Sequence, residues 1–569
     1  MKIIAEYHIK SAKFVLTVPF GMNEHVRGIP NRRFNPTKKV WTAPLIRVNV
    51  NFFASLGNNT LWTFSKEARL AIDTAIEEYK NGPPLSKGFP DWYKFKTEPR
   101  IKQMDALNFS YGKKAVALFM DLRTGKSKVI IDTIAAMYME NVNQAALIVC
   151  PLSIRNNWVR EFETHSPVPV NIHILDASKG KKFDEWDRNS AKLDGPKVLM
   201  VGMESLAAGR AMKYCEQFVS HNSVVMIIDE SSKIKNHAAI RTKNCISLAK
   251  QCDHRYILTG TPIANSIVDL YAQFQFLDPD IIGIGDNYTF RQRYCLLGGY
   301  ENRQIIGYQN INELMELIKP HVYSVTQTEV FDSLPVKNFM VREVTLSGEQ
   351  KRLYTQMRDS KMVATDDLEL RVKNCLEKAL RLQEITGGFV SYANEDTNVK
   401  DKFNRIRIEG NNPKLEELMS CVDETIGSII IWAQYRDEIK LIVSELAAKY
   451  GAEQVVELHG GVSEEDRAVG IAAFQSKTAR FLVGNTATGG MGLTLTAADT
   501  MIYYSISFNY IDRFQSLERM FHDSKKDLFI VDIVAVDTID ISIMEALQAK
   551  ESMAEYVRRS IAINDEPPF

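Results

Sequence analysis

Residues 117–137 read ALFMDLRTGKSKVIIDTIAAM, an apolar strand pattern that runs through the loop RTGKS into a helical pattern. Backbone N–H groups of such a loop and the positive end of the following helix bind phosphate groups. We therefore predict that Thr124, Gly125 and Lys126 hold the phosphates of ATP and that Ser127 coordinates Mg²⁺. The complete phosphate-loop pattern has glycine six residues before the lysine, where this chain has Met120.

A second apolar strand pattern ends in two adjacent acids, in VVMIIDESSKIKN at residues 224–236. Two like charges at the end of a buried strand are costly unless a cation shares the site. We predict that Asp229 binds Mg²⁺ and that Glu230 orients or deprotonates the attacking water. The alternative is that both acids cap the next helix, because acidic side chains are favoured at helix N-termini. The phosphate loop upstream in the same alternating chain favours the catalytic assignment.

Short apolar strand patterns alternate with helical stretches around both motifs, which is typical of a parallel sheet wound with helices. The same rhythm returns after Lys414, in SIIIWAQY, QVVELHG and LFIVDIVA. The sequence between the two regions is charged and mainly helical in pattern. We therefore predict two α/β domains separated by helical material.

Composition excludes several classes of protein. The 569 residues are too many for one hydrophobic core, and 45 % hydrophobic with 25 % charged residues is typical of a globular protein. No apolar run reaches the ~20 residues that cross a bilayer, and Glu6, His8 and Lys10 interrupt any signal-peptide core. We expect no membrane partner and a cytoplasmic location. The seven cysteines are scattered without a C-x-x-C pair, which argues against disulfides and zinc.

The N-terminal region is basic, with nine basic and two acidic side chains in residues 1–50, although the whole chain has 70 of each. Aromatic residues such as Phe34 and Trp41 lie between the cations. Cations attract phosphates and aromatic faces stack on bases, so we predict a nucleic-acid surface here. The cations singled out are Arg32, Arg33, Lys38 and Lys39. The alternative is a small β domain with an aromatic core and solvated lysines.

Together, these motifs resemble helicase superfamily two and, within it, the Swi/Snf-type DNA translocases, including short phage-encoded members. The resemblance covers roughly residues 95–545. The stretch RIKQ is similar to the family's adenine-reading motif, which implies that Arg100 and Gln103 bind ATP. The stretch CPLS resembles the first DNA-contacting motif, which implies that Pro151 and Ser153 contact DNA.

Later motifs follow in the family's order. Motif two has Ser231-Ser232 in place of the usual Ala-His, and residues 258–262, LTGTP, match motif three. Residues 429–434 and 458–461 resemble the opening motifs of the second lobe. The stretch TATGGMGLTL is similar to motif five, which assigns Thr486 and Ala487 to DNA.

Motif six of the family reads Gln-x-x-x-Arg-x-x-Arg, and this chain offers Gln515, Arg519 and His522. The resemblance assigns all three to catalysis, with groups that reach the γ-phosphate. Arginine is a permanent cation, whereas an unperturbed imidazole titrates near ~6.5, so His522 does not guarantee a charge. Either Arg519 acts alone or hydrolysis is slow. An amphipathic surface helix is the alternative for this segment.

Residues 32–45, RRFNPTKKVWTAPL, resemble the core of the HepA-related (HARP) domain of annealing helicases. That resemblance implies branched rather than plain duplex DNA. The predicted fold class is α/β, with two RecA-like parallel-sheet lobes, helical insertions and a small α+β N-terminal domain. The predicted domains are a HARP-like substrate-recognition domain at 1–90, lobe one with a helical protrusion at 91–345, a helical insertion at 346–405, lobe two at 406–545 and a C-terminal helix or tail at 546–569.

The predicted function is an ATP-dependent DNA translocase or helicase that remodels branched DNA by fork regression, branch migration or annealing. It would use ATP and Mg²⁺ and bind duplex, forked or four-way-junction DNA. One alternative is a conventional strand-separating DNA or RNA helicase. Another is a DNA-junction binding module without catalysis, motivated by Met120 and His522. A phage-encoded chain would act in the host cytoplasm.

Overall fold

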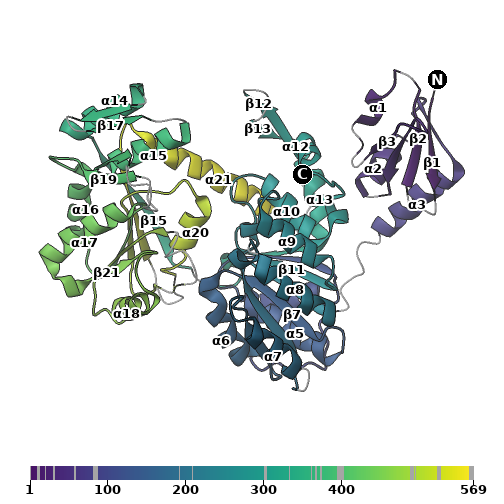
Figure 1. The fold of residues 1–569 in the computed structure, drawn as a ribbon, viewed down its shortest axis with the longest axis horizontal. Coiled ribbons are helices and arrows are strands. Elements are labelled where there is room, and N and C mark those ends of the chain that lie inside the picture. Colours follow the sequence, from purple (N-terminus) through teal and green to yellow (C-terminus); the bar gives the residue numbers. More distant parts are fainter. Residues whose placement is uncertain are drawn as a thin grey trace. The chain divides into compact units, whose positions relative to one another are not determined.

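The computed structural model describes residues 2–8, 13–19, 21–27, 29, 32–45, 47–56, 59–80, 88–190, 193–207, 209–299, 304–331, 334–360, 362–365, 368–371, 375–393, 403–486, 493, 495–521 and 527–562. The chain divides into two compact units, residues 1–330 with 553–569 and residues 331–552. Figure 1 shows the order of the elements along the chain.

The N-terminal domain is a five-stranded sheet with the order β3-β4-β2-β1-β5. Neighbouring strands are antiparallel except β1 and β5. Its own hydrophobic core lies between residues 3 and 76 and includes Phe14, Phe53 and Trp62. The predicted small α+β domain is confirmed. The strands are β1 Ile3–His8, β2 Lys13–Thr17, β3 Arg33–Asn35, β4 Val40–Pro44 and β5 Trp62–Phe64, and the helices are α1 Glu24–Arg27, α2 Arg47–Ser55 and α3 Lys66–Lys80.

The first lobe is built on a seven-stranded sheet, β14-β6-β11-β10-β7-β9-β8, in which every pair is parallel. Its strands are β6 Ala115–Met120, β7 Ala145–Cys150, β8 Asn171–Ile174, β9 Lys197–Gly202, β10 Val224–Asp229, β11 His254–Leu258 and β14 Val322–Val325. Its helices include α4 Ile101–Ser110, α5 Lys126–Met139, α6 Arg155–His165, α7 Gly180–Ser190, α8 Gly209–His221, α9 Ile240–Ala249 and α10 Val268–Leu277.

Both faces of this sheet are covered, which explains why its strands are apolar without alternation. Successive residues of β6 enter different cores: Val116 and Leu118 pack with α4, α5 and α6, and Ala117 and Phe119 pack with α7 to α10. This is the three-layer arrangement that the alternating sequence predicts.

The segment after α10 combines helices with a hairpin. The hairpin β12–β13 projects from the body of the lobe (Figure 1), and Leu297 and Ile305 on it pack against the core below. The elements are α11 Pro279–Ile282, α12 Asn287–Tyr294, β12 Cys295–Gly298, β13 Gln304–Tyr308 and α13 Ile311–Ile318.

The second lobe has a six-stranded parallel sheet with the order β15-β24-β23-β20-β22-β21. The predicted α/β fold with two RecA-like parallel-sheet lobes is therefore confirmed. The strands are β15 Val336–Val344, β20 Ile429–Trp432, β21 Val455–Leu458, β22 Phe481–Gly484, β23 Thr500–Tyr503 and β24 Asp527–Ala535. The helices are α16 Pro413–Glu424, α17 Arg436–Tyr450, α18 Glu464–Gln475, α20 Tyr510–Leu517 and the first part of α21 Ile539–Ala562, whose residues from 553 onward belong to the first unit.

The region between the lobes contains strands as well as helices. It comprises α14 Gly348–Ser360, β16 Met362–Thr365, β17 Leu368–Arg371, α15 Cys375–Thr386, β18 Phe389–Ala393 and β19 Phe403–Arg407. Just before it, β15 pairs along its whole length with β24, from Val336 opposite Asp527 to Val344 opposite Ala535. Both β15 and its partner β24 belong to the second unit. The domain boundaries drawn from the sequence stay predictions.

Candidate active site

The topology of the first sheet brings three motifs to one edge. Strand β11 lies between β6 and β10, with Leu258 opposite Leu118 on one side and Asp229 on the other. Carboxyl ends of parallel strands meet at the same edge of a sheet, where α/β proteins bind their ligands. The phosphate loop after β6, the segment 259–262 after β11 and the acids at the end of β10 are therefore neighbours.

The phosphate loop follows β6 and turns directly into α5. Gly125 has a φ of 92°, and a Cβ atom there would lie 1.9 Å from the Gln103 amide nitrogen, so the position requires glycine. The Lys126 ammonium donates to the carbonyl oxygens of Met120 at 2.7 Å and Asp121 at 2.9 Å. The loop thus places its lysine over its own carbonyl groups.

Gln103 ties the start of α4 to this loop. Its side-chain oxygen accepts from the backbone N–H of Arg100 at 2.9 Å, and its amide donates to the Thr124 carbonyl at 3.1 Å. Thr124 is buried, and its hydroxyl donates to the Asp121 carbonyl at 2.7 Å. The residues predicted to bind ATP are thus brought together, while their contacts with ATP stay predictions.

Met120, which replaces the expected glycine, is the last residue of β6 and is fully buried in the core against α4 and α5. Its side chain stabilises the lobe while its carbonyl accepts from Lys126. The departure from the phosphate-loop pattern therefore lies in the strand and leaves the turn at 121–125 intact.

Asp229 ends β10 and is partly buried. Its carboxylate accepts from the indole N–H of Trp158 on α6 at 2.8 Å. Burial and the adjacent Glu230 charge raise the pKa of Asp229 to about 6, whereas the Trp158 hydrogen bond and the Lys126 charge act in the opposite direction. A carboxylate whose neighbour is a second acid is a fitting ligand for a cation.

Glu230 has a left-handed backbone with a φ of 63°, which is rare for a residue with a Cβ atom. Its Oε1 accepts from the hydroxyls of Ser232 at 2.8 Å and Thr259 at 3.1 Å. Thr259 follows β11, and its hydroxyl also accepts from the Thr261 N–H at 3.0 Å. Motifs two and three are therefore joined through the Glu230 carboxylate, as neighbouring strand ends allow.

A divalent cation fits the donors present at this edge. Ser127 is the second residue of α5 and is partly buried, and Asp229 supplies a carboxylate. Mg²⁺ usually keeps waters and substrate phosphates and takes only one or two protein carboxylates. Within the described residues no group of three or more His, Cys, Asp or Glu side chains could hold a metal ion. A metal bound jointly with a nucleotide suits this donor set better than an all-protein cage.

The first DNA-contacting motif lies at the start of α6. Pro151 is buried, and Ser153 lies in a short 3-10 helix, Leu152–Ile154, that leads into α6. The Ser153 side chain is outside the described residues. Helix α6 follows this 3-10 helix directly and carries Trp158, so the segment with the predicted DNA contacts leads into the element that binds Asp229.

In the second lobe, Gln515 and Arg519 lie on and just after α20. Gln515 is buried, and the Arg519 guanidinium donates to the Leu493 carbonyl at 3.2 Å. The Leu495 N–H donates to the Arg519 carbonyl at 3.1 Å, so motif six is attached to the end of motif five. Thr486 is buried after β22, whereas Ala487 and His522 lie outside the described residues.

The predicted DNA-binding cations of the N-terminal domain gather on the hairpin β3–β4. Arg33 is exposed on β3, and Lys38 and Lys39 are exposed in the turn. Arg32 is partly buried: it donates to the Ile29 carbonyl and lies 5.7 Å from the Trp41 ring. The exposed Phe34 ring packs 5.1 Å from the same tryptophan. The hairpin thus combines three exposed cations with an aromatic pair.

The supporting contacts of three residues were not predicted from the sequence, although the first DNA-contacting motif extends to Trp158. Trp158 binds Asp229, and Gln273 on α10 accepts from Ser231. Gln327 donates its backbone N–H to the Asp121 carboxylate and its amide to the Leu122 carbonyl, which braces the phosphate loop. Their partners are 42 to 206 residues away in the chain, so no local pattern indicates them.

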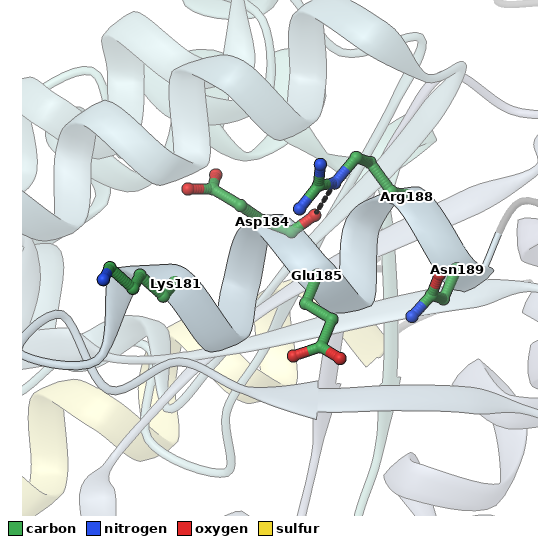
Figure 2. Close-up of a pocket in the computed structure, with 5 residues that line it drawn as sticks. All are labelled: Lys181, Asp184, Glu185, Arg188 and Asn189. Atoms are coloured by element: carbon green, nitrogen blue, oxygen red, sulfur yellow. Dashed lines mark hydrogen bonds between the residues drawn. The ribbon is translucent and has the colours of Figure 1, made fainter.

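A pocket elsewhere on the first lobe contains none of the motif residues. Figure 2 shows its lining, which comes entirely from α7: Lys181, Asp184, Glu185, Arg188 and Asn189. Arg188 donates to the Asp184 carbonyl of its own helix. Separately, no helix in the described part of the chain is long and apolar enough to span a bilayer.

Two parallel-sheet lobes, the first with a phosphate loop and an adjacent Asp-Glu pair, define the class of helicase-like ATPases with RecA-like lobes. Residues 61–387, more than half of the chain, match the family model described as the SNF2-related domain. Residues 413–523 match the helicase conserved C-terminal domain. The chain belongs to the SNF2-related family.

Similar proteins share limited identity with the chain. The CHD3-type chromatin-remodeling factor CHR7 of Arabidopsis thaliana is 24 % identical over 464 residues, covering 79 % of this chain and 36 % of the relative. The ATP-dependent helicase fft3 of Schizosaccharomyces pombe is 22 % identical over 547 residues, covering 82 % of this chain. The chain spans 58 % of the length of that relative.

A solved structure, the Sulfolobus solfataricus SWI2/SNF2 ATPase core in complex with dsDNA, is similar at 19 % sequence identity and a TM-score of 0.36. The alignment covers 84 % of this chain and 97 % of that one.

Proposed function

We propose that the chain is an ATP-dependent DNA translocase that remodels branched DNA by fork regression, branch migration or strand annealing. The observation that carries the catalytic part is the convergence of Lys126, Asp229, Glu230 and Thr259 at the ends of three adjacent parallel strands. Membership of a family of helicase-like ATPases also supports the catalytic part of the proposal.

In this proposal, the backbone N–H groups of the phosphate loop and the Lys126 ammonium hold the phosphates of ATP. Lys126 would exchange the Met120 and Asp121 carbonyls for phosphate oxygens, because an ammonium prefers an anionic acceptor. Ser127 and Asp229 would hold Mg²⁺, whose bound charge neutralises the phosphates. Arg100 and Gln103 would contact the adenine.

Glu230 would orient and deprotonate the attacking water. Two hydroxyls, from Ser232 and Thr259, donate to the same carboxylate oxygen, Oε1. They leave Oε2 as the acceptor for the water.

DNA would contact both the motor and the N-terminal domain. Pro151, Ser153, Thr486 and Ala487 are the proposed contacts of the two lobes. The exposed cations and aromatic pair of the β3–β4 hairpin support a role in binding branched DNA, because phosphates and unstacked bases occur together at a junction.

The test is ATP turnover by the purified chain without nucleic acid and with linear duplex, forked DNA, four-way junctions, single-stranded DNA or RNA. We expect stimulation by duplex and stronger stimulation by branched DNA. Strongest stimulation by single strands or RNA would favour a strand-separating helicase instead. Absence of turnover with every nucleic acid would leave a junction-binding module.

The matched variant is Lys126→Ala. It should abolish hydrolysis and leave DNA affinity almost unchanged, because the Lys126 ammonium lies at the phosphate loop, where it donates to the Met120 and Asp121 carbonyls. Turnover is followed by phosphate release and DNA affinity by fluorescence anisotropy. Wild-type turnover in this variant would remove the assignment of the loop.

A further inference from the structure

Two serines follow Glu230, and both hydroxyls are buried. Ser231 and Ser232 open a 3-10 helix, Ser231–Ile234, and are 0 % and 1 % exposed. The Ser232 hydroxyl donates to Glu230 itself, whereas the Ser231 hydroxyl donates 2.7 Å to the side-chain oxygen of Gln273. The two hydroxyls therefore have different partners, one within the motif and one on α10.

Gln273 lies in the middle of α10 and is fully buried. Its amide nitrogen donates to the Pro262 carbonyl at 2.7 Å and to the Asp269 carbonyl at 2.9 Å. Both of its N–H groups and its oxygen are thus satisfied inside the protein, which is the condition under which a buried amide fixes one geometry. One side chain connects the residue after Glu230 with the end of the segment 259–262.

The segment 259–262 is also anchored at its first residue, Thr259. Thr259 donates to Glu230, and a Cβ atom on Gly260 would lie 3.4 Å from the Met120 carbonyl, so the segment also lies against the phosphate loop. The hydrogen bonds close a ring that runs from Glu230 through Ser231, Gln273 and Pro262 to Thr259 and back. The ring thus connects Glu230 with both ends of the segment 259–262.

We propose that Ser231 and Gln273 are positioning residues for hydrolysis, which lock Glu230 and the segment 259–262 into one unit. An alanine at residue 231 has no hydroxyl, so the link depends on the serine of this chain. The inference rests on the proposed function, in which Glu230 acts on the attacking water. A small displacement of a catalytic group has a large effect on rate, whereas ATP affinity depends on the phosphate loop.

The experiment is a double-mutant cycle with Ser231→Ala, Gln273→Met and the double variant in the full chain. Ser231→Ala should lower kcat about tenfold and leave KM for ATP within about twofold, because the group acts only through Glu230. If the two residues act through one bond, the double variant is no slower than the slower single variant. Hydrogen–deuterium exchange at residues 259–262 should become faster in both single variants.

Ser266→Ala is the matched control. The Ser266 hydroxyl accepts from the Val268 N–H at the start of the same helix α10, and within the part of the chain that the structure describes no hydrogen bond joins this hydroxyl to Glu230 or Gln273. It should leave kcat and the exchange at residues 259–262 unchanged. If Gln273→Met does not fold, Ser231→Ala with its exchange pattern decides the question.

The outcomes separate this inference from the proposed function. Absent turnover in the wild-type chain would overturn both. Normal wild-type turnover with an unchanged kcat in Ser231→Ala would overturn only the role of Ser231 and Gln273. A change of KM alone, or equal effects of Ser266→Ala, would mean that the serine merely stabilises the lobe.

Discussion

At the scale of single residues, Glu230 combines a strained backbone with the proposed role of catalytic base. Its left-handed backbone costs roughly 1–2 kcal/mol relative to an ordinary conformation. Strained residues persist where the surrounding structure over-determines them, as the hydroxyls of Ser232 and Thr259 do here. With this backbone conformation, the Glu230 side chain reaches Thr259 of motif three.

Glu230→Gln should reduce ATP turnover by about 10²–10⁴-fold, the usual contribution of a general base, without weakening ATP binding. The amide oxygen can still accept from Ser232 and Thr259, so the geometry is retained while the proton acceptor is lost. Phosphate release and equilibrium binding of a fluorescent ATP analogue measure the two effects.

Glu216→Gln, at an exposed position of α8, is the control and should behave as the wild-type chain. Full turnover in Glu230→Gln would mean that another group acts as the base.

Arg519 gives a second prediction. If it stabilises the transition state, Arg519→Ala should lower turnover by about 10³–10⁵-fold, the range known for decisive arginine fingers. Arg519 also donates to the Leu493 carbonyl, so Arg519→Lys is needed to retain a charge and a donor while removing the planar fork. His522→Arg should leave turnover unchanged or raise it, because it adds a permanent cation.

Arg352→Ala, which removes an exposed arginine paired with Glu349 on α14, is the control for that series. A clear loss of turnover in His522→Arg would show that the histidine has an adapted role.

At the scale of elements, strand β3 and the turn that follows it present their side chains to solvent, whereas β4 contributes Ala43 to the core of the domain. All three residues of β3 are exposed, and Lys39 at the turn has a φ of 53°. The Arg32 guanidinium lies over the Trp41 ring and donates to the Ile29 carbonyl, so Arg32 also contributes to the packing of the domain. A test of DNA binding should therefore leave Arg32 and Trp41 in place.

The triple variant Arg33→Ala, Lys38→Ala and Lys39→Ala should weaken junction binding and reduce its salt dependence. Each phosphate contact contributes about 0.9 to the slope of log affinity against log salt, so the slope should flatten by up to about 2.7. Titrations of a four-way junction by anisotropy at several salt concentrations measure the slope.

A charge-matched variant, Lys2→Ala, Lys13→Ala and Lys66→Ala, removes three exposed lysines of the same domain outside the hairpin. It should keep the slope. An unchanged slope in the hairpin variant, with the domain folded, would refute a DNA-binding role for the hairpin.

At the scale of the whole molecule, the N-terminal domain and the first lobe have separate hydrophobic cores. Among the described residues, the N-terminal core comprises members between residues 3 and 76, and the core that packs against α4 to α6 of the first lobe begins at Phe89. Phe89 packs against Tyr93 and Tyr111, and its N–H donates to the Asn108 side chain. A truncation that preserves the lobe must therefore keep Phe89.

A chain that begins at Gly88 should be folded, and its ATPase should still respond to linear duplex, because the motif residues from Arg100 onward are all retained. Its preference for forks and four-way junctions should disappear. The measurement is the ratio of ATPase stimulation by junction and by duplex for the truncated and full chains. Aggregation or a large drop in melting temperature would instead make the domain a structural cap.

Much of this organisation could be predicted from the sequence because its signals are local. The apolar runs around Met120 and Asp229 predict parallel strands covered on both faces, and a glycine before Lys126 predicts the tight turn of a phosphate loop. The order of the motifs indicated the family, which the matches to residues 61–387 and 413–523 confirm. The assigned roles of the site residues stay predictions.

Only the tertiary structure decided which distant side chains support the site. The sequence does not indicate that Trp158 binds Asp229, that Ser231 binds Gln273, or that β15 pairs with β24 at the other end of the second lobe's sequence. Propensity and periodicity act over a few residues, whereas these partners are brought together by strand order and helix packing. The chain's own sequence therefore determined the elements and their motifs, and packing determined how the catalytic groups are held.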